Sequence, residues 1–589
     1  MGSSVRAPAV EGKRLDSWKE IAAYLNRDVT TVQRWEKREG MPVYRHVHDK
    51  RGSVYAVAAE LDAWLENRRP EVAEQAAGEP TSLTKPAAPG VLRDRGRVWW
   101  WVVVAVVVCA GLAVAGYIAW RAHERATAGP QIRSLAVLPL RNLSGDASQD
   151  YLADGMTEEL IGRLTGIREL RVTSHTSVMR FKDPKQTVPE IAKALGVDAV
   201  VEGSVIREGS RIRVSAQLIR AATDTHMWSE TYDRDVSDAL TLESELAQAI
   251  AEKVRVTVTG EEQQRLAAAR PVAPEVYESY LKGRYAFDGA NGRPELAQAI
   301  AYFEDAIAKD PTFAPAYVGV AESYTEMGTV FVGQSPEGTR PKVMEAARKA
   351  LEIDPTLASA HGVLANALQQ EWQWAEADKE YRRALELNPN DGVTNAEYAL
   401  WLSDQGRADE AIATIQHARE LDPVSVSGSG VSWVLFQAHR FDEAIRESRD
   451  SAAVHPENAL VLMGLGFALL GKDEAAEAVK VLEKADAVSK GSPAVEGILV
   501  RAYAHAGRRA DAERVLGNLK RRRETGYVPA AAFVNAYLGM GDKEQAFVWL
   551  EEAYKERSNI LQFVKTHPFF DPIRGDRRFV DLERRIGLK

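Results

Sequence analysis

One stretch of the sequence imitates a phosphate-binding loop. Residues 466–473 have two glycines and a lysine at the spacing of such a loop. That loop also needs a Ser or Thr after its lysine to hold Mg²⁺. Asp473 occupies that position, and the stretch falls within a predicted helix rather than after a strand. We therefore reject a nucleotide site here.

Three other sets of side chains are of types that can take part in catalysis or metal binding. Asp154 and Glu158 have the types of a carboxylate pair for acid–base chemistry, but a helix start explains them better, because acidic groups there meet the helix dipole. His46 and His48 lie on a basic loop, where imidazoles more often contact phosphate or solvent than bind a metal. Cys109 is the single cysteine, which excludes disulfides and cysteine-based zinc sites. We predict no catalytic residue, no metal, no cofactor and no enzymatic activity.

A cluster of polar and basic side chains near the N-terminus has the types that bind nucleic acid. Residues 12–70 contain 12 Lys/Arg and 9 Asp/Glu, whereas the whole chain has a net charge of −9. Basic side chains neutralise phosphates, and Arg and Gln side chains read base edges in the major groove. The predicted DNA-binding residues are Thr30, Thr31, Gln33, Arg34, Lys37, Arg38, Arg45, Lys50 and Arg51.

Two short helices joined by a tight turn must position these side chains. Ser17 is predicted to cap the first helix, and Asp28 or Thr30 to cap the second. The spacing of Val32 and Trp35 predicts that both face inward from the second helix. Such a pair of helices suits insertion of the second helix into a major groove.

The motifs at residues 18–25, 29–35 and 60–65 resemble the excisionase/MerR-type winged helix-turn-helix family. This resemblance implies that the second helix reads double-stranded DNA and that the wing touches the DNA backbone. The alternative is a helical protein-binding domain without DNA contacts. The predicted domain covers residues 12–69, and residues 70–97 are predicted to be a flexible linker because they lack hydrophobic periodicity.

Residues 98–120 are predicted to form a single transmembrane helix. They contain no charged residue, and a helix of about 20 apolar residues spans the core of a bilayer. Aromatic residues at both ends suit the two lipid–water boundaries. More basic residues precede the stretch than follow it, which favours a cytoplasmic N-terminus and a periplasmic C-terminus in the bacterial inner membrane. The alternative is a buried helix of a soluble domain.

Residues 131–262 are predicted to form a mixed α/β domain. Apolar and polar residues alternate along 211–220, as in a strand that is buried on one face. The other predicted strands are residues 134–140, 168–173, 199–207 and 225–232, and the predicted helices start at Asp154 and cover residues 188–195 and 242–254. Motifs at residues 135–140, 142–146, 154–160, 195–205 and 216–219 resemble the TolB amino-terminal and FlgO-like domains. This resemblance implies an extracytoplasmic interaction domain.

A fixed period organises residues 272–560. Prolines of Asp-Pro-like turns recur at intervals of 44, 34, 34 and 33 residues, at Pro311, Pro355, Pro389, Pro423 and Pro456. This period resembles the tetratricopeptide family and implies about eight helix pairs in an all-α solenoid, with a concave surface for a peptide or protein. Residues 561–589 are predicted to cap the array. The predicted groove residues are Tyr317, Tyr324, Asn366, Asn395 and Trp401.

The predicted fold is therefore multidomain: a winged helix-turn-helix, one transmembrane helix, a mixed α/β domain and an all-α tetratricopeptide solenoid. This order resembles membrane-anchored transcriptional regulators of the ToxR/CadC type. It implies double-stranded DNA, a lipid bilayer and a peptide or protein ligand as partners, with homodimerisation or reorientation as the signal. The alternative is an envelope scaffold whose N-terminal domain does not bind DNA.

Overall fold

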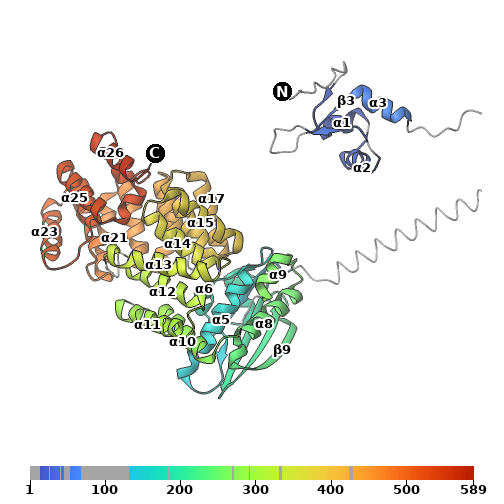
Figure 1. The fold of residues 1–589 in the computed structure, drawn as a ribbon. Helices are drawn as coiled ribbons and strands as arrows, with labels where there is room; N and C mark the ends of the chain where they lie inside the picture. Colours follow the sequence, from blue (N-terminus) through green and yellow to red (C-terminus); the bar gives the residue numbers. More distant parts are fainter. Residues whose placement is uncertain are drawn as a thin grey trace, which may run out of the picture. The chain divides into compact units, whose positions relative to one another are not determined.

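The computed structural model describes residues 14–25, 27–39, 41–45, 54–67, 132–182, 185–267, 271–290, 292–329, 335–423 and 429–588. The chain divides into two compact units, residues 1–117 and 118–589 (Figure 1). The predicted linker (70–97) and the predicted membrane span (98–120) lie outside the described residues. Among the helices of the described ranges, none has both the length and the apolar composition needed to cross a bilayer.

The first unit is a small helical domain with a three-stranded sheet. Its elements are β1 (Arg14–Leu15), α1 (Trp18–Tyr24), α2 (Val29–Glu39), β2 (Tyr44–Arg45), β3 (Val54–Val57) and α3 (Ala58–Asn67). Strand β3 is central and runs antiparallel to both β1 and β2. Ile21, Val32, Ala56 and Leu61 are fully buried, so both helices of the pair, the hairpin and α3 each contribute to one core.

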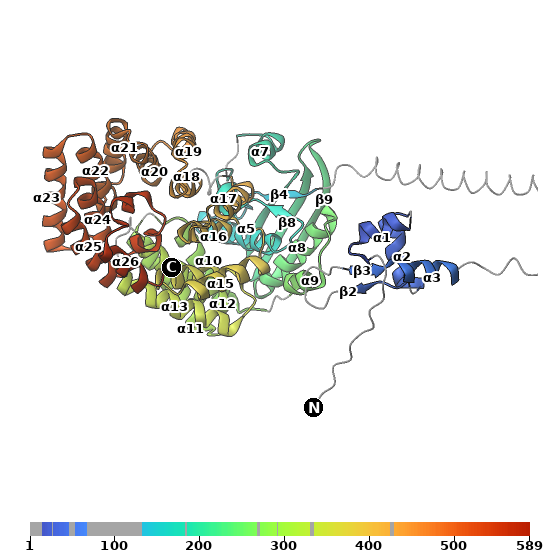
Figure 2. The ribbon, with the colours of Figure 1, turned by 90° about the horizontal axis from the view of Figure 1, so that it is seen from above.

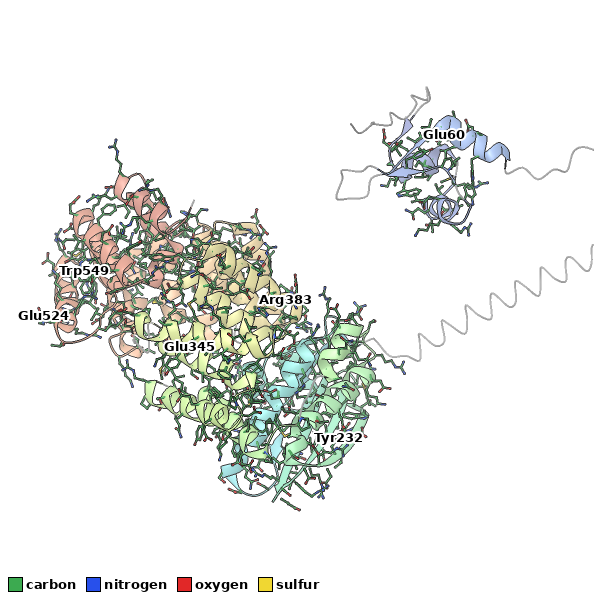
Figure 3. The ribbon with its side chains drawn as sticks, in the orientation of Figure 1. Glu60, Tyr232, Glu345, Arg383, Glu524 and Trp549 are labelled. Carbon is green, nitrogen blue, oxygen red and sulfur yellow. The ribbon has the colours of Figure 1, made fainter. Side chains whose placement is uncertain are left out.

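Several contacts fasten α3 to the rest of this unit, among them a hydrogen bond of 2.8 Å from the Tyr24 hydroxyl to Asp62. The rings of Trp35 and Trp64 pack with their centroids 5.7 Å apart. The Tyr44 hydroxyl donates a hydrogen bond to the carboxylate of Glu60 over 3.0 Å (Glu60 is labelled in Figure 3). The predicted inward orientation of Val32 and Trp35 is thus what the structure has.

The second unit begins with a mixed sheet in the order β6-β4-β7-β8-β9, with β5 beside β7. Strands β4, β6 and β7 pair in parallel, whereas β7, β8 and β9 pair antiparallel. The elements of this α/β domain are β4 (Ser134–Val137), β5 (Arg141–Asn142), η1 (Ala147–Gln149), α5 (Asp150–Thr165), β6 (Arg171–Val172), α6 (His175–Met179), α7 (Val188–Leu195), β7 (Ala199–Glu208), β8 (Arg211–Arg220), β9 (Thr225–Asp235), η2 (Val236–Asp238), α8 (Ala239–Val254) and α9 (Gly260–Ala267).

One face of the sheet is buried by helices. Ile212, Val214 and Leu218 of β8 are fully buried, while Arg211 and Arg213 between them are exposed. Helices α5 and α8 contact one another and pack on the sheet, and Figures 1 and 2 show them side by side. The alternation predicted for residues 211–220 is therefore confirmed.

The predicted helix start at Asp154 is wrong. The Asp146 carboxylate accepts a hydrogen bond from the Ser148 amide over 2.9 Å, which caps η1, and α5 continues directly from it at Asp150. Asp154 therefore lies inside the helix, buried, and forms an ion pair with Lys182 over 2.6 Å. Because an earlier aspartate starts the helical turn, Asp154 has no unpaired backbone amide to cap.

Eight antiparallel helix pairs fill the described part of residues 274–555. Ala365, Ala377, Ala399 and Ala411, which recur at the predicted period, are fully buried between helices. The helices are α10 (Pro274–Asp288), α11 (Arg293–Lys309), α12 (Ala314–Met327), α13 (Pro336–Ile353), α14 (Ala358–Gln370), α15 (Trp374–Leu387), α16 (Gly392–Asp404), α17 (Ala408–Leu421), α18 (Ser429–Gln437), α19 (Phe441–Val454), α20 (Ala459–Gly471), α21 (Ala475–Val488), α22 (Pro493–His505), α23 (Arg509–Thr525), α24 (Ala530–Met540) and α25 (Lys543–Lys555).

The last pair is covered by the end of the chain. Within α24 and α25, Phe533 and Trp549 stack with centroids 3.8 Å apart (Trp549 is labelled in Figure 3). Helix α26 (Arg577–Arg585) pairs with α25 through Arg578–Glu544 and Arg585–Glu551 ion pairs of 2.8 and 2.6 Å. Of the two short helices before it, η4 (Pro568–Ile573) contacts α24, whereas η3 (Asn559–Phe563) contacts α14 and α16 as well as α25. The array thus curves until its third and fourth pairs meet its end.

Candidate functional site

The second helix of the first unit is fixed at its start by an aspartate. The carboxylate of Asp28 accepts hydrogen bonds from the Thr31 amide and from the Thr31 hydroxyl, over 2.8 and 2.7 Å. These bonds lower the pKa of Asp28. They also satisfy a backbone donor that the helix itself leaves unpaired. Of the two predicted caps, Asp28 is the one found in the structure. The hydroxyl of Thr31 is hydrogen-bonded to it.

The outer face of α2 carries cations that have no partner among the described residues. Thr30, Arg34 and Lys37 are exposed and lie at helical spacing on one face, and Gln33 beside them is half-buried. Among the described residues, nothing forms a hydrogen bond or ion pair with the side chains of Arg34 or Lys37. Since no described residue compensates either charge, this face can approach phosphates and base edges.

The remaining predicted DNA contacts are not placed by the structure. Arg38 and Arg45 belong to α2 and β2, but their side chains lie outside the described part of the chain. Lys50 and Arg51, with the two histidines of the same loop, fall in residues 46–53, which are also outside it.

The five residues predicted to line the repeat groove do not form one surface. Asn395 is buried and donates to the backbone oxygens of Pro389 and Asp391 at the start of α16, over 3.1 and 2.8 Å. Trp401 is buried against Tyr398, with ring centroids 5.6 Å apart.

The other three are also engaged. The Tyr317 hydroxyl donates to a backbone oxygen of the preceding turn, and Tyr324 accepts a hydrogen bond from Lys342 over 3.0 Å. Asn366 accepts from Gln370 over 2.6 Å and lies beside Glu397. Two of these contacts, Tyr324–Lys342 and Asn366–Glu397, join different helices, whereas the others lie within one helix or the turn before it.

The inner side of the array is occupied by the chain itself. Gln369 of α14 donates to Gln562, and Thr566 donates to Gln437 of α18. The ring of Trp433 packs against Phe563 with centroids 5.2 Å apart. Residues 557–574 thus run across the first helices of several pairs. The sequence predicted that residues 561–589 cap the array, and Phe570, Ile573 and Phe579 of this segment do share a core with the last helix pair. The beginning of the same segment contacts the inner side of the array as well.

The turns between helix pairs bind the α/β domain. Asn390 donates to the backbone oxygens of Ile167 and Leu170 over 2.8 and 3.0 Å. Asn388, in the same turn, donates to the Thr165 hydroxyl over 3.0 Å. The recurring turn positions therefore serve as a docking edge for the end of α5 and the strand that follows.

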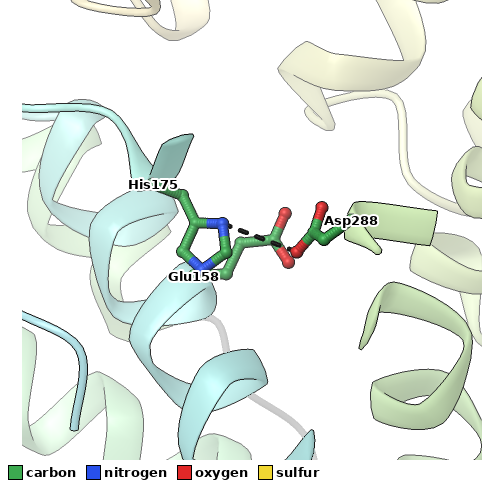
Figure 4. Close-up of side chains that lie close together, drawn as sticks. All are labelled: Glu158, His175 and Asp288. Atoms are coloured by element: carbon green, nitrogen blue, oxygen red, sulfur yellow. Dashed lines mark ion pairs between the residues drawn. The ribbon is translucent and has the colours of Figure 1, made fainter. Parts of the chain in front are cut away.

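A charged cluster lies where α5 and α6 meet the first helix pair. Arg284 of α10 donates to Glu158 of α5, with 3.0 Å between Nε and Oε2, and also pairs with Glu322 of α12. His175 lies 3.5 Å from Asp288, and Figure 4 shows both side chains converging on Glu158. Single ligand atoms of Glu158, His175 and Asp288 lie within 4.8 Å of one another, so this trio has the donor set of a cation site. The guanidinium of Arg284 competes for the same carboxylate.

Desolvation and the Arg284 charge act in opposite directions in this cluster. Burial acts to raise the pKa of Glu158, but the charge and hydrogen bonds of Arg284 outweigh it and hold the pKa below its ordinary value. Burial and the nearby charge of Glu158 raise the pKa of Asp288 to about 7. Burial lowers the pKa of His175. Glu158 is therefore ionised at neutral pH, whereas Asp288 has a pKa close to neutral pH.

Sequence reasoning missed this cluster. Arg284 and Glu158 are 126 positions apart, on elements of different types. Helical spacing on α10 places Arg284 near the face that packs, but no pattern in the sequence connects that helix with α5.

Two family models match the second unit. The model described as the HilA/YgeH-like transcriptional regulator, second domain, matches residues 131–253, and that of the tetratricopeptide repeat matches residues 358–391. The chain therefore carries a domain of transcriptional regulators together with a repeat type that binds proteins. The family model that matches the α/β domain is thus that of this regulator domain. The sequence had led us to expect the TolB amino-terminal or FlgO-like domain.

Curated relatives share part of the chain. "Putative adenylate cyclase 3" of Rhizobium meliloti (strain 1021) is 31% identical over 261 residues, which cover 42% of this chain and 44% of that protein. Type IV pilus assembly protein PilF of Pseudomonas aeruginosa is 26% identical over 174 residues, which cover 30% of this chain and 56% of that protein. The chain thus spans about half the length of these two relatives.

Among solved structures, a thermophilic tetratricopeptide protein of Thermus thermophilus is 16% identical, with a TM-score of 0.29. The likeness covers 33% of this chain and 99% of that protein.

One prediction is contradicted by these relatives. The sequence led us to expect no enzymatic activity, because no nucleophile, metal cluster or nucleotide loop was recognised. The Rhizobium relative carries the name of an adenylate cyclase. The exclusion of enzymes is therefore withdrawn: a relative with an enzyme's name shares the matched region.

Proposed function

We propose that this protein is a membrane-anchored, one-component transcriptional regulator. In this proposal the first unit binds double-stranded DNA in the cytoplasm, residues 98–120 cross the inner membrane once, and the second unit receives a signal in the periplasm. The match of residues 131–253 to a transcriptional regulator domain supports the regulatory role. The uncharged stretch at 98–120 supports the anchor.

The observation that carries DNA binding is the outer face of α2. It presents two cations that nothing in the described part of the unit neutralises, on a helix whose start is capped and whose inner face is locked in a core. A rigid helix with free Arg and Lys side chains after a tight turn is the geometry of a major-groove reader. The hydrogen bonds of Thr31 to Asp28 remove that residue from the set of base contacts and leave Arg34 as the main one.

DNA capture from living cells tests this role. The full chain is crosslinked to DNA in its bacterial host, and the enriched fragments are compared between the wild type and the double variant Arg34→Ala, Lys37→Ala. We expect sequence-specific enrichment that the double variant loses. Lys484→Ala, which removes an exposed charge from α21, serves as the matched control and should keep the enrichment. Equal enrichment by the double variant counts against the DNA-reading role.

Reporter fusions test the membrane arrangement separately. A reporter that is active only in the periplasm should be inactive after residue 75 and active after residue 300. Activity at both positions, or at neither, would remove the transmembrane part of the proposal and leave DNA binding untouched.

A second candidate is an envelope assembly scaffold, which the similarity to a pilus assembly protein favours. In that case the repeats bind other proteins and the first unit binds a protein in the cytoplasm. Loss of DNA enrichment in the wild type, together with co-purification of envelope proteins through residues 274–555, would favour the scaffold. The Rhizobium relative adds a third assay, conversion of ATP to cyclic AMP by the purified full chain.

A further inference from the structure

An apolar pocket of about 200 Å³ lies on the inner side of the array, between the first helices of the later pairs and the C-terminal segment. Its walls come from α18, α20, α22 and α24, and η3 closes one side. The apolar side chains that form it are Trp433, Met463, Phe467, Ile498, Ile560 and Phe563. An apolar cavity of about 150 Å³ already accepts a benzene molecule.

Aromatic contacts hold the walls of this pocket in place. The ring of Trp433 packs edge-on against Phe467 and Phe563, with centroids 5.3 and 5.2 Å apart. His567 packs against the same tryptophan at 5.4 Å. Edge-to-face contacts fix the relative orientation of rings. The pocket is therefore preformed, which reduces the ordering that a ligand would otherwise have to impose.

Three polar sites in the pocket, on Thr329, Asn535 and Nε2 of His567, lack a hydrogen-bond partner among the described residues. The hydroxyl oxygen of Thr329 is buried and forms no hydrogen bond with any described residue. The side-chain amide of Asn535 forms none with any residue in the described ranges. Buried polar groups in folded proteins are nearly always paired. A few unpaired polar groups on an apolar wall are the usual arrangement of a small-molecule site.

The third group is the imidazole of His567. Its Nδ1 accepts a hydrogen bond from the Phe569 amide over 3.2 Å, so in the neutral ring the proton is on Nε2. Burial and the positive charge of Arg501 lower the pKa of His567, which keeps the ring neutral. Within the described part of the chain, Nε2 has no partner, so it is a free donor at the pocket wall.

The pocket also excludes charged ligands. None of the lining residues in the described ranges is an Asp, Glu, Lys or Arg. A carboxylate or an ammonium group would lose its hydration there without gaining a counter-charge, which is costly. An amide or hydroxyl group, in contrast, can both accept from His567 and pair with Asn535 or Thr329.

We propose that this pocket binds a small, uncharged and mostly apolar molecule that carries one amide or hydroxyl group, of the size of a substituted benzene ring. Such a ligand would bridge α24, η3 and the turn after α12, which come from opposite ends of the array. The proposal goes beyond the proposed function, because binding is measured directly and does not require that the protein reads DNA or crosses a membrane.

A pair of isosteric probes tests the charge requirement. Benzamide and benzoate have nearly the same shape and differ in charge, and benzyl alcohol supplies the hydroxyl variant. Binding to the purified full chain is measured by displacement of 4-fluorobenzamide, followed through its fluorine NMR line width. We expect saturable displacement by benzamide and benzyl alcohol and at least tenfold weaker displacement by benzoate. Benzoate binding as tight as benzamide, or no saturable binding of any neutral probe, overturns the proposal.

Substitutions place the probe in this pocket. Ala531→Leu adds bulk to the wall and should abolish binding, whereas Ala476→Leu, on an exposed face of α21, should leave it unchanged. Asn535→Ala removes one polar partner without adding bulk and should weaken benzamide about tenfold. If both pocket variants, Ala531→Leu and Asn535→Ala, bind benzamide as the wild type does, the site is elsewhere and the proposal fails. Displacement of the fluorinated probe by peptides but not by benzamide would assign the groove to a protein partner and also overturn it.

Discussion

Two arginines on two helices show how this chain uses charge in different ways. Arg34 on α2 is exposed and has no partner among the described residues, whereas Arg284 on α10 is mostly buried and pairs with Glu158 and Glu322. Both helices are fixed in their surroundings by apolar contacts, so the difference does not come from the rigidity of the backbone. It comes from whether the chain itself supplies the opposite charge.

This difference separates architecture from recognition. The guanidinium of Arg284 forms its ion pairs inside the protein and helps to hold the α/β domain against the repeats. Its removal would leave two carboxylates without a counter-charge. A guanidinium left free on a rigid helix contributes little to folding and is available to a partner from outside. Substitutions of the two arginines should therefore have opposite consequences for stability and for binding.

The largest effect is expected for Arg284→Ala. This change leaves Glu158 and Glu322 partly buried without a counter-charge, and breaking a buried pair costs about 3–5 kcal/mol. Urea unfolding of the full chain should show this loss, with DNA binding intact below the transition. Arg509→Ala removes an exposed arginine paired with Glu513 and should change the free energy of unfolding by less than about 0.5 kcal/mol. A loss for Arg284→Ala as small as that of the control would mean that the cluster does not hold the two domains together.

The next effect concerns binding alone. Arg34→Ala should weaken binding to the preferred DNA site by about 1–3 kcal/mol, and Lys37→Ala should lower the slope of binding against salt by about 1. Neither change should alter the free energy of unfolding, because neither side chain has a partner in the described part of the unit. Gel-shift titrations at several salt concentrations measure both quantities. If Arg34→Ala destabilises the unit as much as it weakens binding, the contrast with Arg284 disappears.

Buried acidic groups inside the repeats should make the stability of the protein depend on pH, unlike exposed charges. Burial raises the pKa of Asp404 to about 7, although Gln437 and Gln369 each donate a hydrogen bond of 3.0 Å to it. Between its ordinary pKa of 3.8 and about 7, the folded state binds more protons at this site than the unfolded state does. Its contribution to stability is therefore present at low pH and is lost as pH rises through about 7.

We therefore expect Asp404→Asn to flatten the fall in stability between about pH 4 and pH 7. The change is on the order of 1 kcal/mol per pH unit, since one unit of pKa corresponds to about 1.4 kcal/mol. Urea midpoints of the full chain at each pH measure it. Part of the slope should remain, because burial raises the pKa of Glu397 to about 8 as well. An unchanged slope in Asp404→Asn would show that this aspartate is ionised throughout.

Local patterns predicted most of the fold. The alternation along 211–220 and the helical stretch at 188–195 gave the bounds of β8 and α7, because each depends on neighbours in sequence. The 34-residue period likewise located the repeat pairs. By contrast, β5 has only two residues, Arg141–Asn142, and exists because β7 offers a free edge beside it. No pattern within two residues predicts that pairing.

The sites divide in the same way. The exposed face of α2 follows from spacing within a single helix and was predicted from the sequence, which also offered Asp28 as one of two possible caps. The C-terminal segment on the inner side of the array depends on the closing curvature of eight pairs, which brings Gln369 to Gln562 over 193 positions. Two of the predicted groove residues, Asn395 and Trp401, are buried, because amide and aromatic side chains at helical spacing also serve to pack helices.

The smallest effect on stability and binding is expected for substitutions of Asp28. This residue is exposed like Arg34 but has partners inside the protein like Arg284. Its carboxylate is exposed, yet it pairs with the Thr31 amide and hydroxyl rather than with an external partner. Asp28→Ala should lower the stability of α2 by about 1 kcal/mol, because an N-cap is lost, whereas Asp28→Asn should cost only a few tenths.

Hydrogen exchange of the α2 amides, followed by mass spectrometry, measures this local stability. Because the helix that carries Arg34 would fray at its start, Asp28→Ala should also weaken DNA binding, by less than Arg34→Ala does, and Asp28→Asn should leave it unchanged. Faster exchange without any loss of affinity would mean that the first turn of α2 does not face the DNA. Arg34 would then act from the middle of the helix independently of its cap.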